Sequence, residues 1–232
     1  MAEVGKPRMR VLRGIPASAG IAVGKGYFLN RALPRSVQST IGREKVEEEV
    51  AAFQRAVTRS KEQIRSIRDG VADSASEHHQ ILSVHLALLE DSMLLEQTVR
   101  MIRENQFTAD WAFNKVLQSL LETFHRIEDP YLRERGHDLR QIGHRVLENL
   151  AGRPLDSVAS IREPVIIVAH DLSPADTAQI LKSPVQGFAT DVGSRTSHTA
   201  ITARSLGIPA VVGLERITEE YGTAETVIVD GE

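Results

Sequence analysis

Apolar residues recur at helical spacing through the middle of the chain, between residues 43 and 152. The first stripe repeats every three, four or seven positions and consists of Val46, Val50, Phe53, Val57, Ile64, Ile67 and Val71. Such a stripe is typical of a helix that buries one face. Further stripes lie at 81–89, 94–102 and 111–124, and Asp129-Pro130 begins a fifth helix that Gly152 ends. The pattern predicts a bundle of short helices and not one long coiled coil.

The two ends of the chain have a different pattern. Residues 9–30 contain short apolar runs broken by glycines and Pro16, which predicts β structure. From residue 163 onward, apolar runs of strand length lie at 165–169, 187–191, 208–213 and 226–230. Ser173-Pro174 between two of these runs is typical of a capped helix start. Strands that alternate with short helices predict an α/β fold here.

Composition narrows the class of protein. The chain of 232 residues has 41% hydrophobic and 25% charged residues, as ordinary globular proteins do. A net charge of −3 gives no basis for nucleic-acid binding, and the lack of cysteine excludes disulfides and thiolate chemistry. We find no signal-peptide core and no apolar run of membrane-spanning length, so we expect a cytoplasmic protein without a membrane partner.

The densest motif occupies residues 193–213. It predicts a loop, a short helix, a stop at Gly207-Ile-Pro209 and a buried strand. His198 stands where the loop meets the helix, and either Thr196 or Ser197 can cap that helix. The motif therefore predicts a histidine at the positive end of a helix dipole.

Two interpretations of His198 remain open from the residues alone. A histidine at a helix start most often only caps or packs. Here, however, donors for phosphate oxygens crowd the same turn, namely Arg195, Thr196, Ser197 and Thr199. A neutral imidazole beside an anion site is what a nucleophile for phosphoryl groups requires.

The motif closely resembles the phosphohistidine signature of Enzyme I of the bacterial sugar phosphotransferase system. That family usually has two glycines before Arg-Thr-Ser-His, whereas this chain has Gly193-Ser194. The resemblance covers nearly the whole chain, and its other segments lie at 14–24, 85–91, 131–135, 138–143 and 171–177. Pyruvate phosphate dikinases and phosphoenolpyruvate synthases share the histidine motif but not the preceding helical insertion.

The resemblance implies a two-part fold. Residues 1–32 and 153–232 would form a discontinuous phosphohistidine α/β domain of the swivelling β/β/α type. An all-α helical-bundle domain at 33–152, which binds the carrier protein HPr, would be inserted between them. Only the resemblance, and not the pattern itself, joins residues 9–30 to the later strands.

The resemblance also implies roles for individual residues. His198 would be phosphorylated at Nε2, and the hydroxyl of Thr177 would orient its ring. Arg195 would act in catalysis, and the phosphate would lie in a loop made by Gly193, Thr196, Ser197 and Thr199.

The HPr-binding face is expected on the helices. The segment 81–94 has more apolar residues than one buried face needs, and its acidic rim suits a basic partner. The resemblance places HPr there and extends the face to an arginine of a later helix. The expected contacts are Glu77, Ile81, Val84, His85, Leu88, Asp91, Leu94 and Arg135.

The implied function is phosphoryl transfer from phosphoenolpyruvate to a histidine of HPr, the first step of sugar transport by this system. Family members continue into a barrel that binds phosphoenolpyruvate and magnesium and that carries the dimer contact. We therefore expect a monomeric fragment of the phosphotransferase that contains no cofactor and is competent only for the half-reaction with HPr.

Two alternatives stay open. One is the nitrogen-related branch of Enzyme I, which typically carries a sensory domain in front, for which this chain has no room. The other is a non-enzymatic helical binding module in which His198 only caps.

The remaining histidines do not predict a site. His78 and His85 lie about 10.5 Å apart along a helix, too far for both to bind one metal ion. His170 precedes Asp171, but adjacent strand residues point to opposite faces. We therefore expect neither a metal site nor a second catalytic pair.

Overall fold

The computed structural model divides into two compact units, and each is described by itself. The structure describes residues 10–29, 33–34, 36–71, 77–127, 130–153, 158–220 and 226–232, without the side chains of 77 and 130–134. One unit, the helical unit, contains residues 30–162 and 172–183. The other, the α/β unit, contains residues 1–29, 163–171 and 184–232.

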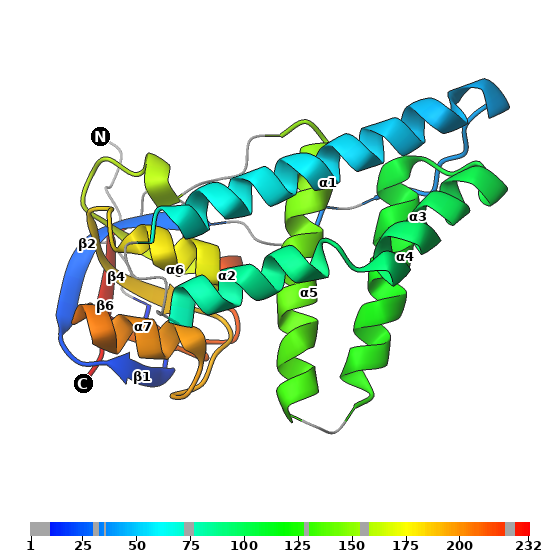
Figure 1. Cartoon of the computed structure of the whole chain (residues 1–232). Helices are drawn as coiled ribbons and strands as arrows, with labels where there is room; N and C mark the ends of the chain where they lie inside the picture. The colour runs from blue at the N-terminus through cyan, green and yellow to red at the C-terminus, as the bar shows by residue number, and fades with distance from the viewer. Residues whose placement is uncertain are drawn as a thin grey trace, which may run out of the picture. The chain divides into compact units, whose positions relative to one another are not determined.

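The helical unit is built from the predicted bundle (Figure 1). After a 3₁₀ turn at Arg43–Lys45, its helices are α1 (Val46–Asp69), α2 (Glu77–Leu88), α3 (Ser92–Asn105), α4 (Ala109–His125), α5 (Pro130–Leu150) and, after a 3₁₀ turn at Val158–Ser160, α6 (Pro174–Ile180). Helices α4 and α5 run side by side, while α1 contacts α2, α3, α4 and α5. Residues 153, 158–162 and 172–183, which were expected in the α/β domain, thus belong to the helical unit.

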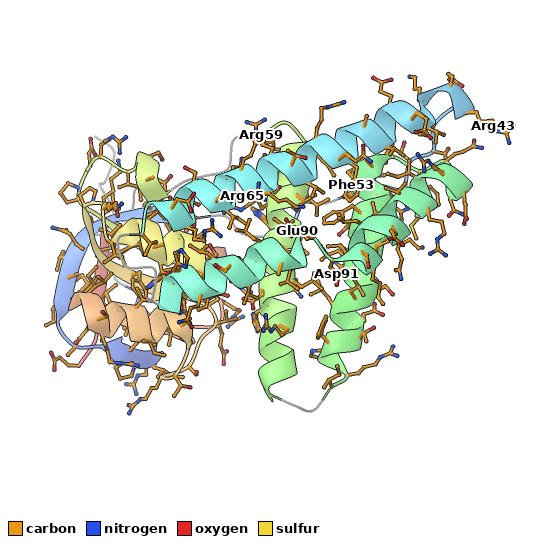
Figure 2. All side chains as sticks on the ribbon, in the orientation of Figure 1. Arg43, Phe53, Arg59, Arg65, Glu90 and Asp91 are labelled. Atoms are coloured by element: carbon orange, nitrogen blue, oxygen red, sulfur yellow. The ribbon has the colours of Figure 1, made fainter. Side chains whose placement is uncertain are left out.

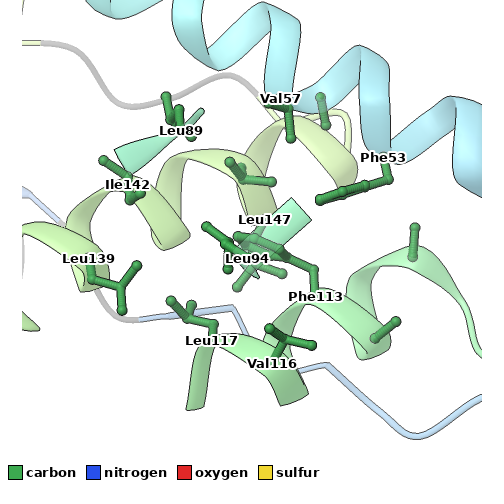
Figure 3. Packing of buried hydrophobic residues seen from close by; sticks show 14 of the residues in the cluster. Phe53, Val57, Leu89, Leu94, Phe113, Val116, Leu117, Leu139, Ile142 and Leu147 are labelled. Atoms are coloured by element: carbon green, nitrogen blue, oxygen red, sulfur yellow. The ribbon is translucent and has the colours of Figure 1, made fainter. Parts of the chain in front are cut away.

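The apolar stripes of these helices meet in one core. Figure 3 shows Phe53 of α1 beside Phe113 of α4, whose ring centroids lie 5.5 Å apart. Leu94 at the start of α3 and Ile142 of α5 are fully buried in the same cluster. Helical spacing therefore predicts the core correctly, because each stripe faces the others.

Carboxylates of α1 secure the ends of other helices. Thr108 precedes α4 but makes no capping bond with its side chain. Instead Glu49 accepts a hydrogen bond from the Ala109 amide at 2.7 Å. Arg103 of α3 donates to both oxygens of Glu47, at 2.9 and 3.0 Å, and this bonding lowers the pKa of the Glu47 carboxyl. The start of α1 thus contacts both α3 and α4 through polar bonds.

The α/β unit contains one six-stranded sheet in the order β1-β5-β4-β3-β2-β6. Its strands are β1 (Ile15–Ser18), β2 (Ile21–Leu29), β3 (Val165–Ala169), β4 (Val185–Thr190), β5 (Ala210–Val212) and β6 (Thr226–Asp230). The four inner strands β2, β3, β4 and β5 are parallel to one another, and the edge strands β1 and β6 are antiparallel to β5 and β2. The pairing of β2 with β3 confirms that the N-terminal β segment joins the later strands.

Burial explains the residue patterns of β3 and β2. All five residues of β3 are buried, as expected for the central strand of a parallel sheet. In β2 the exposed Ile21 and Val23 alternate with the buried Ala22, as expected nearer an edge. Helix α7 (His198–Leu206) packs on β1 and β5, and the short α8 (Ile217–Glu220) packs on β3 and β4. An α/β fold is therefore present, while its swivelling type stays a prediction.

Adjacent residues at the start of α3 allow a direct test of the core. Leu94 is 1% exposed and Met93 is 55% exposed. Leu94→Ala should lower the free energy of unfolding by about 2–5 kcal/mol, because it leaves a cavity in the bundle. Met93→Ala should change it by less than about 0.5 kcal/mol. Urea unfolding of both variants checks this; equal losses would contradict the packing described.

Candidate active site

His198 lies at the carboxyl end of the parallel strands. Strand β4 ends at Thr190, the chain crosses a loop of residues 191–197, and His198 is the first residue of α7. Ligands of open α/β sheets bind at this edge, where loops leave the strand ends. The predicted order of strand, loop, helix and strand is confirmed.

Ser197 defines the start of α7. Its backbone is extended, and its Oγ accepts a hydrogen bond from the Ala200 amide at 3.3 Å. The same hydroxyl donates to the Ser194 carbonyl at 2.9 Å, and the Ser197 amide donates to that carbonyl at 3.1 Å. Ser197, and not Thr196, is therefore the cap, and two bonds to the Ser194 carbonyl close the turn before His198.

Glycines shape both ends of this segment. Gly193 has φ +131°, and a Cβ atom there would lie 2.9 Å from the Cβ of Val212. Gly207 ends α7 in the left-handed conformation, with φ +63°, as predicted. The loop therefore needs glycine at 193 for both space and conformation.

The charges around His198 suit an anion. The first turn of a helix presents amide N–H groups and a partial positive charge, which attract anions such as phosphate. Arg195 and Thr196 are exposed in the same loop, where the hydroxyls of Ser194 and Thr196 lie 3.2 Å apart. His198 is half-buried and Thr199 is buried behind it. The loop thus gathers one imidazole, one guanidinium and several hydroxyls.

Thr177 belongs to the other unit. It is fully buried in α6, and its hydroxyl donates to the Pro174 carbonyl at 3.1 Å. Helix α6 begins with the predicted cap, in which Ser173 and Asp176 bond each other's backbone amides. The expected bond from Thr177 to the ring of His198 would join the two units, and it stays a prediction.

The structure adds a cluster that sequence reasoning missed. His170 does not pair with Asp171 but with Asp191, whose Oδ2 lies 3.1 Å from its Nδ1. Thr218 donates to the same carboxylate through its amide and its hydroxyl. A signal was present: His170 follows one predicted strand and Asp191 ends another, and parallel strands end at one edge.

The expected HPr-binding residues do not form one exposed face. Leu94 is 1% exposed in the bundle core, so its assignment as a surface contact is wrong. His85 is also wrong as a surface contact, because it is 2% exposed and its Nε2 lies 3.1 Å from Asp138 of α5. Leu88 is half-buried against the core. His85 and Leu88 face inward because α2 packs on α1, α5 and α6, and Leu94 faces inward because α3 packs on α1 and α4.

The remaining expected contacts are more accessible. Ile81 and Val84 of α2 and Arg135 of α5 are half-buried, and Asp91 is exposed. Asp91 caps α3 by accepting from the Leu94 amide at 3.0 Å. The side chain of Glu77 lies outside the described residues. The apolar residue best exposed in this region is Met93, at the start of α3.

Within the described residues, no His, Asp and Glu side chains form a group of three or more that could hold a metal ion. The same part of the chain contains no helix with the length and apolar character of a membrane span.

Two family models match the chain. The model described as PEP-utilising enzyme, N-terminal, matches residues 13–135, more than half of the chain. The chain belongs to the PEP-utilising enzymes. A second model, PEP-utilising enzyme, mobile domain, matches residues 161–232, which include the His198 loop.

The similar curated proteins are phosphoenolpyruvate-protein phosphotransferases. That of Bacillus sp. (strain S) is 38% identical over 225 residues, and that of Bacillus subtilis (strain 168) is 39% identical over 227 residues. The alignments cover 97% and 96% of this chain but only 39% of either relative. The chain therefore spans about two fifths of the length of the curated relatives it matches.

Solved structures agree with the family. An NMR solution structure of Enzyme I (nEIt) is 42% identical, with a TM-score of 0.76, and the match covers 95% of this chain and 90% of that one. An N-terminal domain of Enzyme 1 – Nitrogen is 27% identical, with a TM-score of 0.62 over the same shares. The resemblance to Enzyme I stated from residues 193–213 is confirmed.

The need for glycine at 193 can be tested with Gly207 of the same segment as the matched control. Both have positive φ, but a Cβ at Gly207 would meet nothing within 4 Å. Gly193→Ala should lower the free energy of unfolding by roughly 2–4 kcal/mol through strain and overlap. Gly207→Ala should lower it by only about 1 kcal/mol. Denaturant unfolding measures both, and an equal cost would argue against the close approach to Val212.

Proposed function

We propose that His198 carries a phosphoryl group and exchanges it with a histidine of an HPr-like carrier protein. The observation that supports this most is its position as the first residue of α7, directly behind the Ser197 cap. Arg195 and the hydroxyls of Ser194 and Thr196 lie in the same loop. Similarity to phosphoenolpyruvate-protein phosphotransferases supports the same chemistry.

The proposed reaction is a direct displacement. The lone pair of His198 Nε2 forms a bond to phosphorus while the bond from phosphorus to the carrier's histidine breaks. The released ring keeps the electron pair of that bond, so the exchange is reversible between similar phosphoramidates. The protein contributes position and charge: the N-terminus of α7 and Arg195 attract the phosphate oxygens.

The proposed docking surface for the carrier is the α2–α3 corner, defined by Ile81, Val84, Glu90, Asp91 and Met93. Figure 2 shows Glu90 and Asp91 where α2 ends and α3 begins. A carboxylate oxygen of Glu90 lies 3.4 Å from Lys61 Nζ and 3.6 Å from an Arg65 nitrogen of α1, so its charge is partly balanced. Because Met93 is exposed and Leu94 is buried, Met93 replaces Leu94 as the proposed apolar anchor of the corner.

In the longer relatives we propose phosphoenolpyruvate as the first donor, as their name states. Magnesium and the dimer contact would belong to the part of those proteins that this chain does not span. Both assignments rest on the resemblance alone.

The nitrogen-related branch is the second candidate, favoured by the similarity to the N-terminal domain of Enzyme 1 – Nitrogen. The chemistry of His198 would be the same, and only the carrier would differ. Transfer rates measured with HPr and with a nitrogen-branch carrier separate the two candidates.

The nucleophile is tested with radiolabelled phospho-HPr, prepared with a complete Enzyme I and then freed of it. The chain should gain an acid-labile, base-stable label that maps to His198. His198→Ala should gain none, because no other described histidine starts a helix of this kind. His125→Ala, at an exposed end of α4, should keep the label. Labelling of folded His198→Ala protein would contradict the proposal.

Docking is tested by comparing arginine substitutions at two exposed apolar residues, Met93 and Leu181. Met93→Arg should weaken HPr binding at least about tenfold, as loss of an apolar anchor does. Leu181→Arg is the control, since Leu181 belongs to the same unit and is 52% exposed. Titration calorimetry measures affinity, and circular dichroism confirms folding. Wild-type affinity in a folded Met93→Arg variant would remove the α2–α3 corner as the docking surface.

A further inference from the structure

Asp191 is a buried carboxylate at the base of the His198 loop. It is the first residue after β4, and only 3% of it is exposed. A charge so far from water is costly unless hydrogen bonds compensate for the lost hydration. The partners of this carboxylate therefore show what the residue does.

The carboxylate joins two other segments of the α/β unit. Its Oδ2 lies 3.1 Å from Nδ1 of His170, the residue after β3. Its Oδ1 accepts from the Thr218 amide at 3.1 Å, and its Oδ2 accepts from the Thr218 hydroxyl. Thr218 belongs to α8. One side chain thus connects the end of β3, the short helix α8 and the loop that leads to His198.

The backbone around Asp191 is held as well. Its amide donates to the Ala169 carbonyl at 3.1 Å, and its carbonyl accepts from the Glu215 amide at 2.8 Å. The Val192 amide donates to the His170 carbonyl at 3.1 Å, and the Val192 carbonyl accepts from the Thr190 hydroxyl at 2.7 Å. The first two residues of the loop are therefore fixed on both sides, directly before Gly193.

We propose that Asp191 is a positioning residue, which sets where His198 is presented by anchoring the start of its loop to His170 and Thr218. The inference rests on the proposed role of His198. Phosphoryl transfer depends on placement of the attacking nitrogen, and small displacements of a catalytic group lower its rate strongly. Asp191 touches neither the phosphate nor the reacting ring in this scheme; it acts through the loop.

Variants of Thr218 give the clearest test of this anchor, because they can remove the hydroxyl alone. Thr218→Val keeps the shape and the amide but loses the bond to Oδ2, whereas Thr218→Ser keeps a hydroxyl. Thr218→Val should lower the maximal rate of transfer from phospho-HPr about tenfold and leave the half-saturating HPr concentration unchanged. Thr218→Ser should restore most of the rate. A merely structural role would not separate rate from saturation in this way.

Asp191→Asn tests the carboxylate itself, with Asp230→Asn as its control. Asp230 is an exposed residue of β6 that accepts from the Glu232 amide. Asp191→Asn should slow transfer by at least about tenfold, and Asp230→Asn should not change it. If Asp191→Asn does not fold, the two Thr218 variants still decide the question.

Amide hydrogen exchange tests the anchor without any phosphate. Thr218→Val should speed exchange at residues 192–199 and leave residues 165–169 of β3 protected. If wild-type protein takes no label at His198, the proposed function fails while faster exchange still supports the anchor. The inference would be overturned if folded Thr218→Val protein exchanged residues 192–199 at the wild-type rate. It would also be overturned if the wild-type chain were labelled at His198 and Thr218→Val protein transferred phosphate equally fast.

Discussion

The register of the parallel pair β3 and β4 is the constraint on which the candidate site depends. Ala169 pairs with Thr190, so the two strands end at the same level. The next residues, His170 and Asp191, then leave the sheet side by side and bond each other. A shift of one residue would turn every side chain of β4 to the other face of the sheet. The loop that carries His198 would then start from a different place.

The same edge explains why the loop is tight. Strand β5 pairs with β4 through Phe188 and Ala189, which brings Val212 beside the start of the loop. The space left there admits only a residue without a Cβ atom, and Gly193 occupies it. The turn closed by Ser197 follows directly. Few residues between β4 and α7 are therefore free to change their backbone conformation. Sheet pairing and helix capping together limit where the imidazole can lie.

Local features of this site could be predicted from the sequence. A helix cap at Thr196 or Ser197, the left-handed Gly207 and the buried strand after Pro209 each depend on a few neighbouring residues, and the segment 193–213 contains them all. Helical spacing likewise predicted the core of the bundle. Its predicted members Phe53, Val116 and Leu117, for example, are buried in that core.

Features that depend on distant pairing could not be predicted in the same way. Both Met93 and Leu94 are apolar, and only the packing of α3 on α1 and α4 shows that Leu94 faces inward. Thr108 has the residue type of a cap, yet Glu49, 60 positions earlier, bonds the first amide of α4. The bond between His170 and Asp191 needs the strand register, which the apolar runs alone do not contain.

Burial changes sharply across the His198 loop, and this gradient suits the proposed phosphoryl transfer. Asp191 is buried and bonded, whereas residues 193–196 are exposed and His198 between them and the core is half-buried. A fully buried phosphohistidine would carry charge away from water at high cost, and a fully exposed one would lack a fixed position. A buried carboxylate at the base and an exposed cation near the tip reconcile these demands. The base of the candidate site is buried and hydrogen-bonded, whereas residues 193–196 of its loop are exposed.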